Sequence, residues 1–191
     1  MRRIWCFLFF VICSGYSLAL DVIGVARGML PDADVSLSSD ELKSYAVKAE
    51  QGDAESAYVL SCYYLKKGEG FYGDGYAWAA KSAAHGSACG MMNVGMCYYD
   101  GLGVEKDFQT AAQFFQRSLA AGNNRVLNAL AHMFAVGEGV PQNAEKAYEY
   151  AVSAVESDVP NSLYMLAALH ANGYGTPPGC FESQRVVTRG N

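Results

Sequence analysis

The chain has 191 residues, of which 51% are hydrophobic and 17% charged, and a formal net charge of −5 at pH 7. These values indicate a globular protein with a core of its own and exclude a wholly disordered chain. An acidic chain without clusters of Lys and Arg argues against a nucleic acid or an anionic membrane surface as its partner.

Residues 1–19 have the pattern of a secretory signal peptide. Two arginines precede an apolar run, Ile4 to Cys13, and the small residues Ser17 and Ala19 precede the expected cleavage site. The alternative, an uncleaved membrane anchor, is not favoured because a span needs about 20 apolar residues. We therefore expect an exported protein, periplasmic or secreted, that begins at Leu20 and has no membrane contact after cleavage.

The next segment, residues 20–39, lacks a helical pattern and is expected to be a lead-in to the folded part. A first helix is predicted from Asp40 to Gln51, with Ser39 as its N-cap and Gly52 at its end.

A repeat begins at Gly52. Four units open at Gly52, Gly86, Gly122 and Asp158, which are 34, 36 and 36 residues apart. A constant period of this length is typical of a helical solenoid, in which each unit stacks on the next.

Each unit is predicted to contain two helices, here named helix A and helix B. Helix A carries apolar residues at helical spacing, and its position nine residues after the opening residue is always small: Ser61, Gly95, Ala131 and Ala167. A small side chain in this column would let a neighbouring helix approach closely.

A Gly-x-Gly pair is expected to end helix A, because glycine readily adopts the left-handed conformation that closes a helix. These pairs are Gly101 with Gly103 and Gly137 with Gly139. Asp107 and Asn143 would then cap helix B.

The second unit carries the clearest motif: Val94-Gly95, Tyr98, Gly101, Gly103-Val104, Asp107, then Ala111 and Phe114. This motif resembles the Sel1-like repeat family, a relative of the tetratricopeptide repeats, and the resemblance covers residues 40–176. It implies an all-α fold, a right-handed α/α solenoid of about four helix pairs. Residues 177–191 depart from the motif and are expected to be irregular or an incomplete last helix.

No catalytic motif, phosphate loop or zinc-ligand spacing is found in the sequence, so we predict neither an enzyme nor a cofactor or metal site. The three histidines are scattered: His85 is expected on the surface, and His170 is expected to pack in a column of aromatic residues.

The cysteines leave one alternative to consider. The cysteine-rich branch of the resembled family, to which penicillin binding and β-lactamase activity are attributed, has cysteines paired eight residues apart across the opening Gly. Here Ala83 and Met91 occupy these positions, and the other units also lack the pair. A β-lactamase-like or penicillin-binding hydrolase is therefore only the alternative.

Disulfide bonds are left open by the sequence for Cys62, Cys89, Cys97 and Cys180. Only the pair Cys89 and Cys97 is excluded, because eight residues of one helix separate them by about 12 Å, beyond disulfide reach.

A concave groove is the favoured binding site. If the units pack as in the tetratricopeptide relatives, the positions three, six and ten residues after each opening residue line it. The resulting candidate residues are Tyr58, Cys62, Met92, Met96, Arg125, Asn128, His132 and Tyr164. Met and Tyr suit adaptable contact with a peptide, and Arg binds a carboxylate bidentately. The alternative is that Tyr58, Met92 and Met96 pack against a neighbouring helix.

These features favour an exported scaffold that binds a protein or peptide. An adaptor in lumenal protein quality control, as for eukaryotic relatives, is a further hypothesis. The partner's identity and the oligomeric state are left open.

Overall fold

The computed structural model describes residues 37–173, in which the regular elements are all helices, without a strand in this range. The predicted signal peptide (1–19) and the predicted irregular end (177–191) lie outside the described residues, and the lead-in segment 20–39 is described only from residue 37. The α-helices are α3 (Ser39–Glu50), α4 (Ala54–Lys67), α5 (Tyr72–Ala84), α6 (Ala88–Asp100), α7 (Phe108–Ala120), α8 (Leu127–Val136), α9 (Ala144–Glu156) and α10 (Ser162–Ala171). Two short 3-10 helices, η1 (Glu69–Phe71) and η2 (Asn124–Val126), precede α5 and α8.

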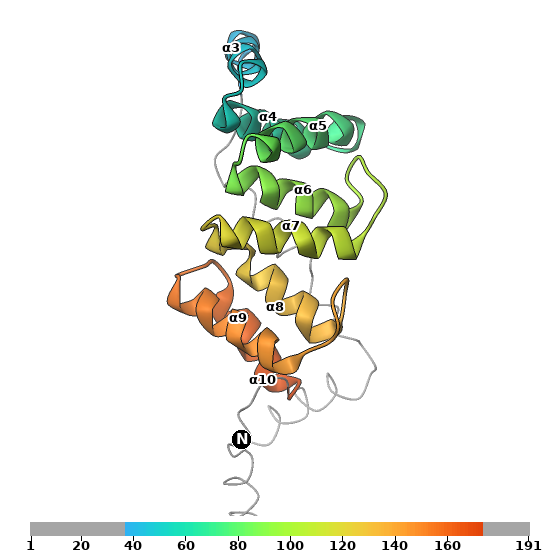
Figure 1. Ribbon diagram of the computed structural model, residues 1–191, viewed down its shortest axis with the longest axis vertical. Helices are drawn as coiled ribbons and strands as arrows, with labels where there is room; N and C mark the ends of the chain where they lie inside the picture. Colours follow the sequence, from blue (N-terminus) through green and yellow to red (C-terminus); the bar gives the residue numbers. More distant parts are fainter. Residues whose placement is uncertain (1–36, 174–191) are drawn as a thin grey trace, which may run out of the picture.

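The helices are stacked in sequence order along one long axis (Figure 1). Helices α4, α6, α8 and α10 are the A helices of the four units, and α5, α7 and α9 are B helices. In the first three units helix A packs on its own helix B, and α10 packs on α9. The A helices of adjacent units also touch: α4 contacts α6, and α8 contacts α10. The predicted all-α solenoid is confirmed, with helix A of the fourth unit as the last described element.

Helix ends are set by local side chains. Asp107 accepts hydrogen bonds from the backbone N–H groups of Gln109 and Thr110, and Asn143 accepts one from Lys146, so both predicted caps of helix B are confirmed. The predicted cap of the first helix is wrong by one residue. Ser38, not Ser39, caps α3, because only Ser38 lies three residues before Glu41 and completes a capping box with it.

The position of helix A that always holds a small residue, nine residues after the opening residue, is buried in the first three units, as predicted. Ser61 and Ala131 are fully covered, and a Cβ added at Gly95 would lie 2.7 Å from the ring of Phe115 on α7. Ala167 is exposed, because no described helix covers this side of α10.

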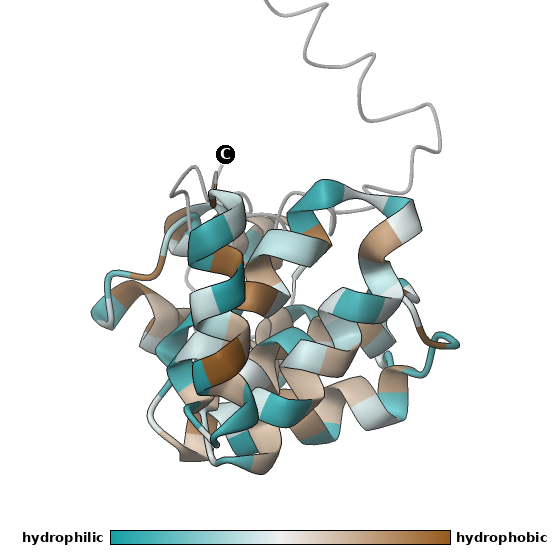
Figure 2. Ribbon diagram, turned by 90° about the horizontal axis from the view of Figure 1, so that it is seen from above, coloured by the Kyte–Doolittle hydropathy of each residue, from teal (hydrophilic) through white to brown (hydrophobic). Residues whose placement is uncertain are grey.

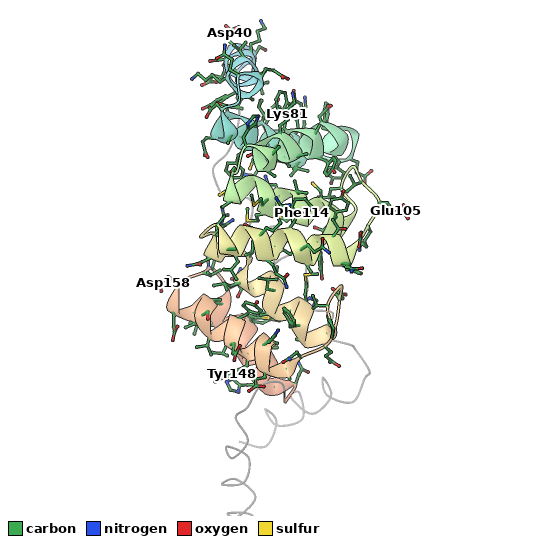
Figure 3. All side chains as sticks on the ribbon, in the orientation of Figure 1. Asp40, Lys81, Glu105, Phe114, Tyr148 and Asp158 are labelled. Carbon is green, nitrogen blue, oxygen red and sulfur yellow. The ribbon has the colours of Figure 1, made fainter. Side chains whose placement is uncertain are left out.

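Aromatic side chains connect the two helices of a unit and adjacent units. Tyr98 stacks on Phe114 of α7, in the middle of the stack (Figure 3), and its hydroxyl lies 3.1 Å from that of Tyr76 in the preceding unit. His170 does contact a ring, that of Tyr148, but it is exposed. The expected packing of His170 against an aromatic ring is found, and its exposure shows that the described helices do not cover this side of α10.

The two glycines of each Gly-x-Gly pair have different roles. Gly101 and Gly137 end helix A in the left-handed conformation, as predicted. Gly103 and Gly139 have a role that the sequence did not indicate. They lie directly against the backbone at Tyr72 and Phe108, where the B helix of the preceding unit begins. A side chain at either position would push adjacent units apart.

The core consists of several hydrophobic clusters that follow one another along the stack. Its largest cluster joins Met92 and Met96 of α6, Phe115 of α7, and Leu130 and Met133 of α8. Viewed down the stack, the helices carry both hydrophilic and hydrophobic residues (Figure 2), as expected of helices that bury one side.

Replacing Gly95 by Leu is expected to lower the free energy of unfolding by about 1–3 kcal/mol or more, since the added side chain must displace the buried ring of Phe115. Thermal melts followed by circular dichroism measure this. Gly73→Ala on α5 is the control: a Cβ there meets nothing within 4 Å, so the change should be neutral or stabilise by up to about 1 kcal/mol. Equal melting midpoints for Gly95→Leu and wild type would contradict the described packing of α6 on α7.

Candidate functional site

The face predicted to be an open groove is largely closed by packing between A helices. Of the eight candidate residues, six are buried: Tyr58, Cys62, Met92, Met96, Asn128 and His132. Arg125 is half-buried, and only Tyr164 is exposed. The expected exposure is therefore wrong for six residues, because successive A helices pack directly on one another along these columns. A binding role for this face stays a prediction.

Arg125 nevertheless acts electrostatically on residues of the two preceding units. Its guanidinium, on η2, lowers the pKa of Cys62 on α4 and of Cys89 on α6, although burial raises both more strongly. It also lowers the pKa of Tyr58, which burial and the neighbouring Cys62 raise. We refer to Tyr58, Cys62, Cys89 and Arg125 as the Arg125 cluster.

Two cations act on the Arg125 cluster: the half-buried Arg125 and the exposed Lys66, whose charge also lowers the pKa of Cys62 that burial raises. Arg125 forms no ion pair with any residue of the described range 37–173. Cys62, Cys89 and Tyr58 all have pKa values raised by burial, so at neutral pH they are uncharged. The exposed Glu55 is the nearby acid, and its carboxylate acts on Cys89. The cluster thus offers a half-buried cation beside neutral hydrogen-bonding groups.

Asn93, which the sequence analysis missed, lies under this cluster. It is fully buried on α6, and its amide nitrogen donates to Ser61 Oγ at 3.1 Å and to Cys62 Sγ at 3.4 Å. Its amide oxygen has no hydrogen-bond partner among the described residues. A signal was present: the same position holds Val59 and Met165 in other units, so an Asn there is out of pattern.

A second polar group is buried between the second and third units. Tyr99 donates its hydroxyl hydrogen to Glu138, in the loop after α8, and the same oxygen lies 3.3 Å from His132 Nδ1. Since a tyrosine hydroxyl has one hydrogen, His132 is the donor in this contact, which fixes its proton on Nδ1. The network holds the Gly137–Gly139 loop to the core and leaves His132 unavailable as a free surface contact.

Asn128 also serves the fold. Its amide nitrogen donates to the carbonyl oxygen of Pro160 at 2.8 Å, and so ties α8 to the turn before α10. Its amide oxygen is buried without a partner. The three polar candidate residues Arg125, Asn128 and His132 therefore differ in role. Asn128 and His132 stabilise the fold, and only Arg125 is partly exposed.

Neither thiol nor metal chemistry is indicated by the described part of the chain. Cys62, Cys89 and Cys97 are free thiols whose pKa values burial raises, to about 12 for Cys97, so they are poor nucleophiles at neutral pH. Between residues 37 and 173 no group of three or more His, Cys, Asp or Glu could hold a metal ion. None of the helices described there is both long and apolar enough to cross a membrane.

Comparison with known proteins identifies the repeat. The Sel1 repeat matches residues 90–123, 125–159 and 160–179. The ERAD-associated E3 ubiquitin-protein ligase component HRD3B of Arabidopsis thaliana is 29% identical over 89 residues, which are 47% of this chain and only 15% of that relative. These findings give no support to the hydrolase alternative.

Two solved structures have the same architecture. A Sel1 repeat protein from Oxalobacter formigenes is 28% identical with a TM-score of 0.62, and the match covers 75% of this chain and 60% of that one. A protective antigen present in uropathogenic Escherichia coli strains, which displays an SLR fold, is 24% identical with a TM-score of 0.67. That match covers 77% of this chain and 32% of the antigen, and at this identity it shows the fold alone.

The buried His132 is expected to make stability depend on pH. Burial lowers its pKa, and the Glu138 carboxylate raises it by less, so the folded state binds the proton more weakly than the unfolded state. Stability is therefore lost as the pH falls below the unfolded value of about 6.5. Between pH 7.5 and 5.5 this loss is at most about 1.4 kcal/mol per pH unit, the slope of one proton.

Denaturant melts across this range should show a smaller loss for His132→Gln than for wild type, even if the variant is less stable throughout. Gln113→Ala, at an exposed position on α7 and without a titrating side chain, is the control and should keep the wild-type slope. An unchanged slope for His132→Gln would show that His132 does not titrate as its burial requires.

Proposed function

Because the chain is a Sel1-repeat protein, we propose that it is an exported, non-catalytic scaffold that binds a peptide segment of a partner protein at the Arg125 cluster. Scaffolds built from Sel1 repeats typically take part in protein–protein interactions. HRD3B of Arabidopsis thaliana is by name a component of an E3 ubiquitin-protein ligase, and a role in an assembly is proposed for this chain by analogy.

The observation that carries this proposal is the half-buried guanidinium of Arg125, which forms no ion pair with any residue between 37 and 173. A cation that is partly removed from water and forms no ion pair gains free energy when a ligand carboxylate binds it. The partner is therefore expected to present a carboxylate, either a chain terminus or an Asp or Glu side chain.

The neighbours of Arg125 fit the rest of a peptide. Cys89 is half-buried and so in part able to contact an uncharged part of a ligand, whereas Tyr58 is buried behind it and its hydroxyl bonds Cys62. Helices α4 and α6 are held by the core and by the Asn93 contacts to Ser61 and Cys62, so the cluster is preorganised.

Export is proposed from the sequence pattern of residues 1–19. Expression of the full chain in a secreting host should give a protein whose intact mass corresponds to a start at Leu20. A mass that still includes residues 1–19 or 2–19 would contradict export by this route.

Replacing Arg125 by Glu should weaken partner binding at least tenfold, since it removes the carboxylate contact and introduces a like charge. Immobilised wild-type and variant proteins are compared for what they retain from a secreted or envelope extract, by quantitative mass spectrometry. Arg117→Glu, an equal charge change on the exposed side of α7, is the control and should retain what the wild type retains.

Circular-dichroism melts must first show that both variants are folded. If Arg125→Glu is folded and retains the wild-type set of proteins unchanged, the Arg125 cluster is not the binding site.

A further inference from the structure

The loop between α8 and α9, residues 137–143, is held differently from the equivalent loop of the preceding unit. Both loops bond to the end of their own helix A. The backbone amides of Glu138 and Asn143 donate to carbonyl groups of α8, as those of Leu102 and Asp107 donate to α6. Glu138 also bonds to a buried side chain, whereas Leu102, at the same repeat position, has no polar group to do so. The two loops are therefore a matched pair for comparison.

Glu138 connects this loop to the core through a network that crosses from the second unit to the third. Its carboxylate accepts the hydroxyl hydrogen of Tyr99 on α6, and the same hydroxyl oxygen lies 3.3 Å from Nδ1 of His132 on α8. That Nδ1 is 3.8 Å from the Glu138 carboxylate. The side chain of His132 is 7% exposed and that of Glu138 34%, so a buried imidazole lies beside an acid that water still reaches. In the preceding unit, Met96 occupies the position of His132.

The same loop carries one of the glycine contacts that set the distance between units. Gly139 lies against the backbone at Phe108, where α7 begins. The ring of Phe108 in turn packs edge-on against that of Tyr99, with 5.0 Å between the ring centroids. Release of Glu138 from Tyr99 would therefore also loosen the Gly139 contact.

This boundary between units depends on side chains more than the others do. Backbones of α4 and α6 approach each other closely, as do those of α8 and α10, whereas α6 and α8 are farther apart. The contacts between α6 and α8 come from side chains, among them Tyr99 with His132. A change in this network is therefore felt directly at the boundary.

We propose that the 137–143 loop is a pH-sensitive switch: protonation of His132 releases Glu138 from Tyr99 and loosens the boundary between the second and third units, while helices α6 to α8 stay folded. The cause is the burial of the imidazole. Burial lowers the pKa of His132 by more than the Glu138 carboxylate raises it, so a proton favours the state in which the imidazole reaches water.

The ionisable groups of α6 do not produce this release. Burial and Glu138 raise the pKa of Tyr99, so its hydroxyl stays neutral. Asp100, whose charge acts on Tyr99, has a pKa that burial raises and the cation of Lys106 lowers by less. The folded state therefore binds a proton at Asp100 more readily than the unfolded state does, so acid favours the closed loop at this residue.

Other elements around α8 carry charges that are directed elsewhere. Among residues 37–173, Glu138 is the one charged group that acts on His132. Arg117 of α7 and Lys146 of α9 each lie over an aromatic ring, and Arg125 of η2 acts on the cysteines of α4 and α6. Three acids of α9 are exposed: Glu145, Glu149 and Glu156.

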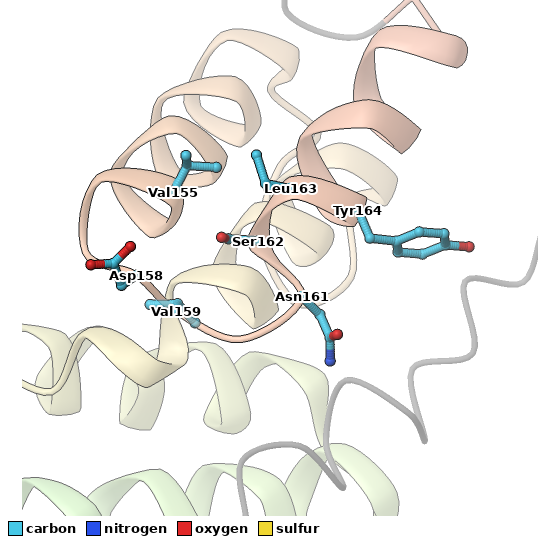
Figure 4. A pocket seen from close by; sticks show the side chains of 7 residues that line it. All are labelled: Val155, Asp158, Val159, Asn161, Ser162, Leu163 and Tyr164. Atoms are coloured by element: carbon cyan, nitrogen blue, oxygen red, sulfur yellow. The ribbon is translucent and has the colours of Figure 1, made fainter.

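The remaining ionisable groups near α9 and α10 are also directed away from the loop. Asp158 lines the cavity between α9 and α10, at the end of α9 that is remote from residues 137–143 (Figure 4). Of the two tyrosines of α9, Tyr148 contacts His170 of α10 and Tyr150 packs on the ring of Phe134.

The direction and size of the effect follow from one proton. In the open state His132 is solvated and has its ordinary pKa of about 6.5. The equilibrium constant for opening therefore rises as the pH falls through this value, by up to about tenfold between pH 7.5 and 5.5.

Hydrogen exchange measured by NMR tests the switch, on the protein recovered from cells expressing the full chain. Protection factors, which already correct for the intrinsic pH dependence of exchange, should fall about three- to tenfold from pH 7.5 to 5.5 at the amides of Glu138 and Asn143. The equivalent amides of Leu102 and Asp107 should keep their protection, because Met96 stands there in place of a histidine.

Two variants identify the group that titrates. His132→Gln should abolish the fall in protection at Glu138 and Asn143. Glu138→Gln keeps an acceptor for Tyr99 and removes the charge that raises the pKa of His132, so the fall should be as large as in wild type or larger. If Glu138 itself were the titrating group, Glu138→Gln would abolish the fall instead. Gln113→Ala, at an exposed site on α7, should behave as wild type.

Four results would overturn the proposal: equal protection of the 137–143 loop at both pH values in wild type, an equal loss in the second-unit loop, a His132→Gln variant that keeps the wild-type pH dependence, or a Glu138→Gln variant that loses it. Because Glu138→Gln changes only a partly exposed side chain, it decides the matter even if His132→Gln does not fold.

Discussion

The units of this stack approach one another at positions that carry no side chain. The backbone of Gly103 lies against that of Tyr72, and a Cβ there would be 2.5 Å from its carbonyl group. Gly139 makes the same contact with Phe108, one period further along. Since backbone atoms cannot yield as a flexible side chain can, these two contacts fix the distance between units. Aromatic and methionine side chains then fill the remaining space.

That close spacing decides what the molecule can offer a partner. Where A helices touch, they bury the residues at the repeat positions between them. Polar residues at these positions therefore stabilise the fold. Asn128 holds the turn at Pro160, and His132 with Tyr99 holds the loop at Glu138. Arg125 is only half-buried, because it lies on η2 before α8 begins. The proposed binding role is therefore assigned to Arg125, the half-buried residue among these polar positions.

The sequence was sufficient for the features that depend on neighbours along the chain. The 36-residue period, the caps at Asp107 and Asn143 and the small column at Gly95 and Ala131 follow from local spacing and were predicted correctly. Exposure of the groove depends on the distance between A helices, which the repeat pattern does not contain, and it was predicted wrongly. For the same reason, Asn93 and the contacts of Gly103 and Gly139 were not foreseen. Asp158 adopts the positive φ of the opening glycines, with a φ of 51°, so the fourth unit keeps the turn without the glycine.

The central claim is that glycine-mediated contacts join the units into one cooperative body, in which the middle is more stable than the ends. Native-state hydrogen exchange of the backbone amides tests this most directly. The account predicts that the amides of α6, α7 and α8 exchange only through a shared opening close to global unfolding, whereas α3 and α10 open at lower free energy. Separate opening of each helix pair, with α6–α7 and α8–α9 at unrelated free energies, would contradict it.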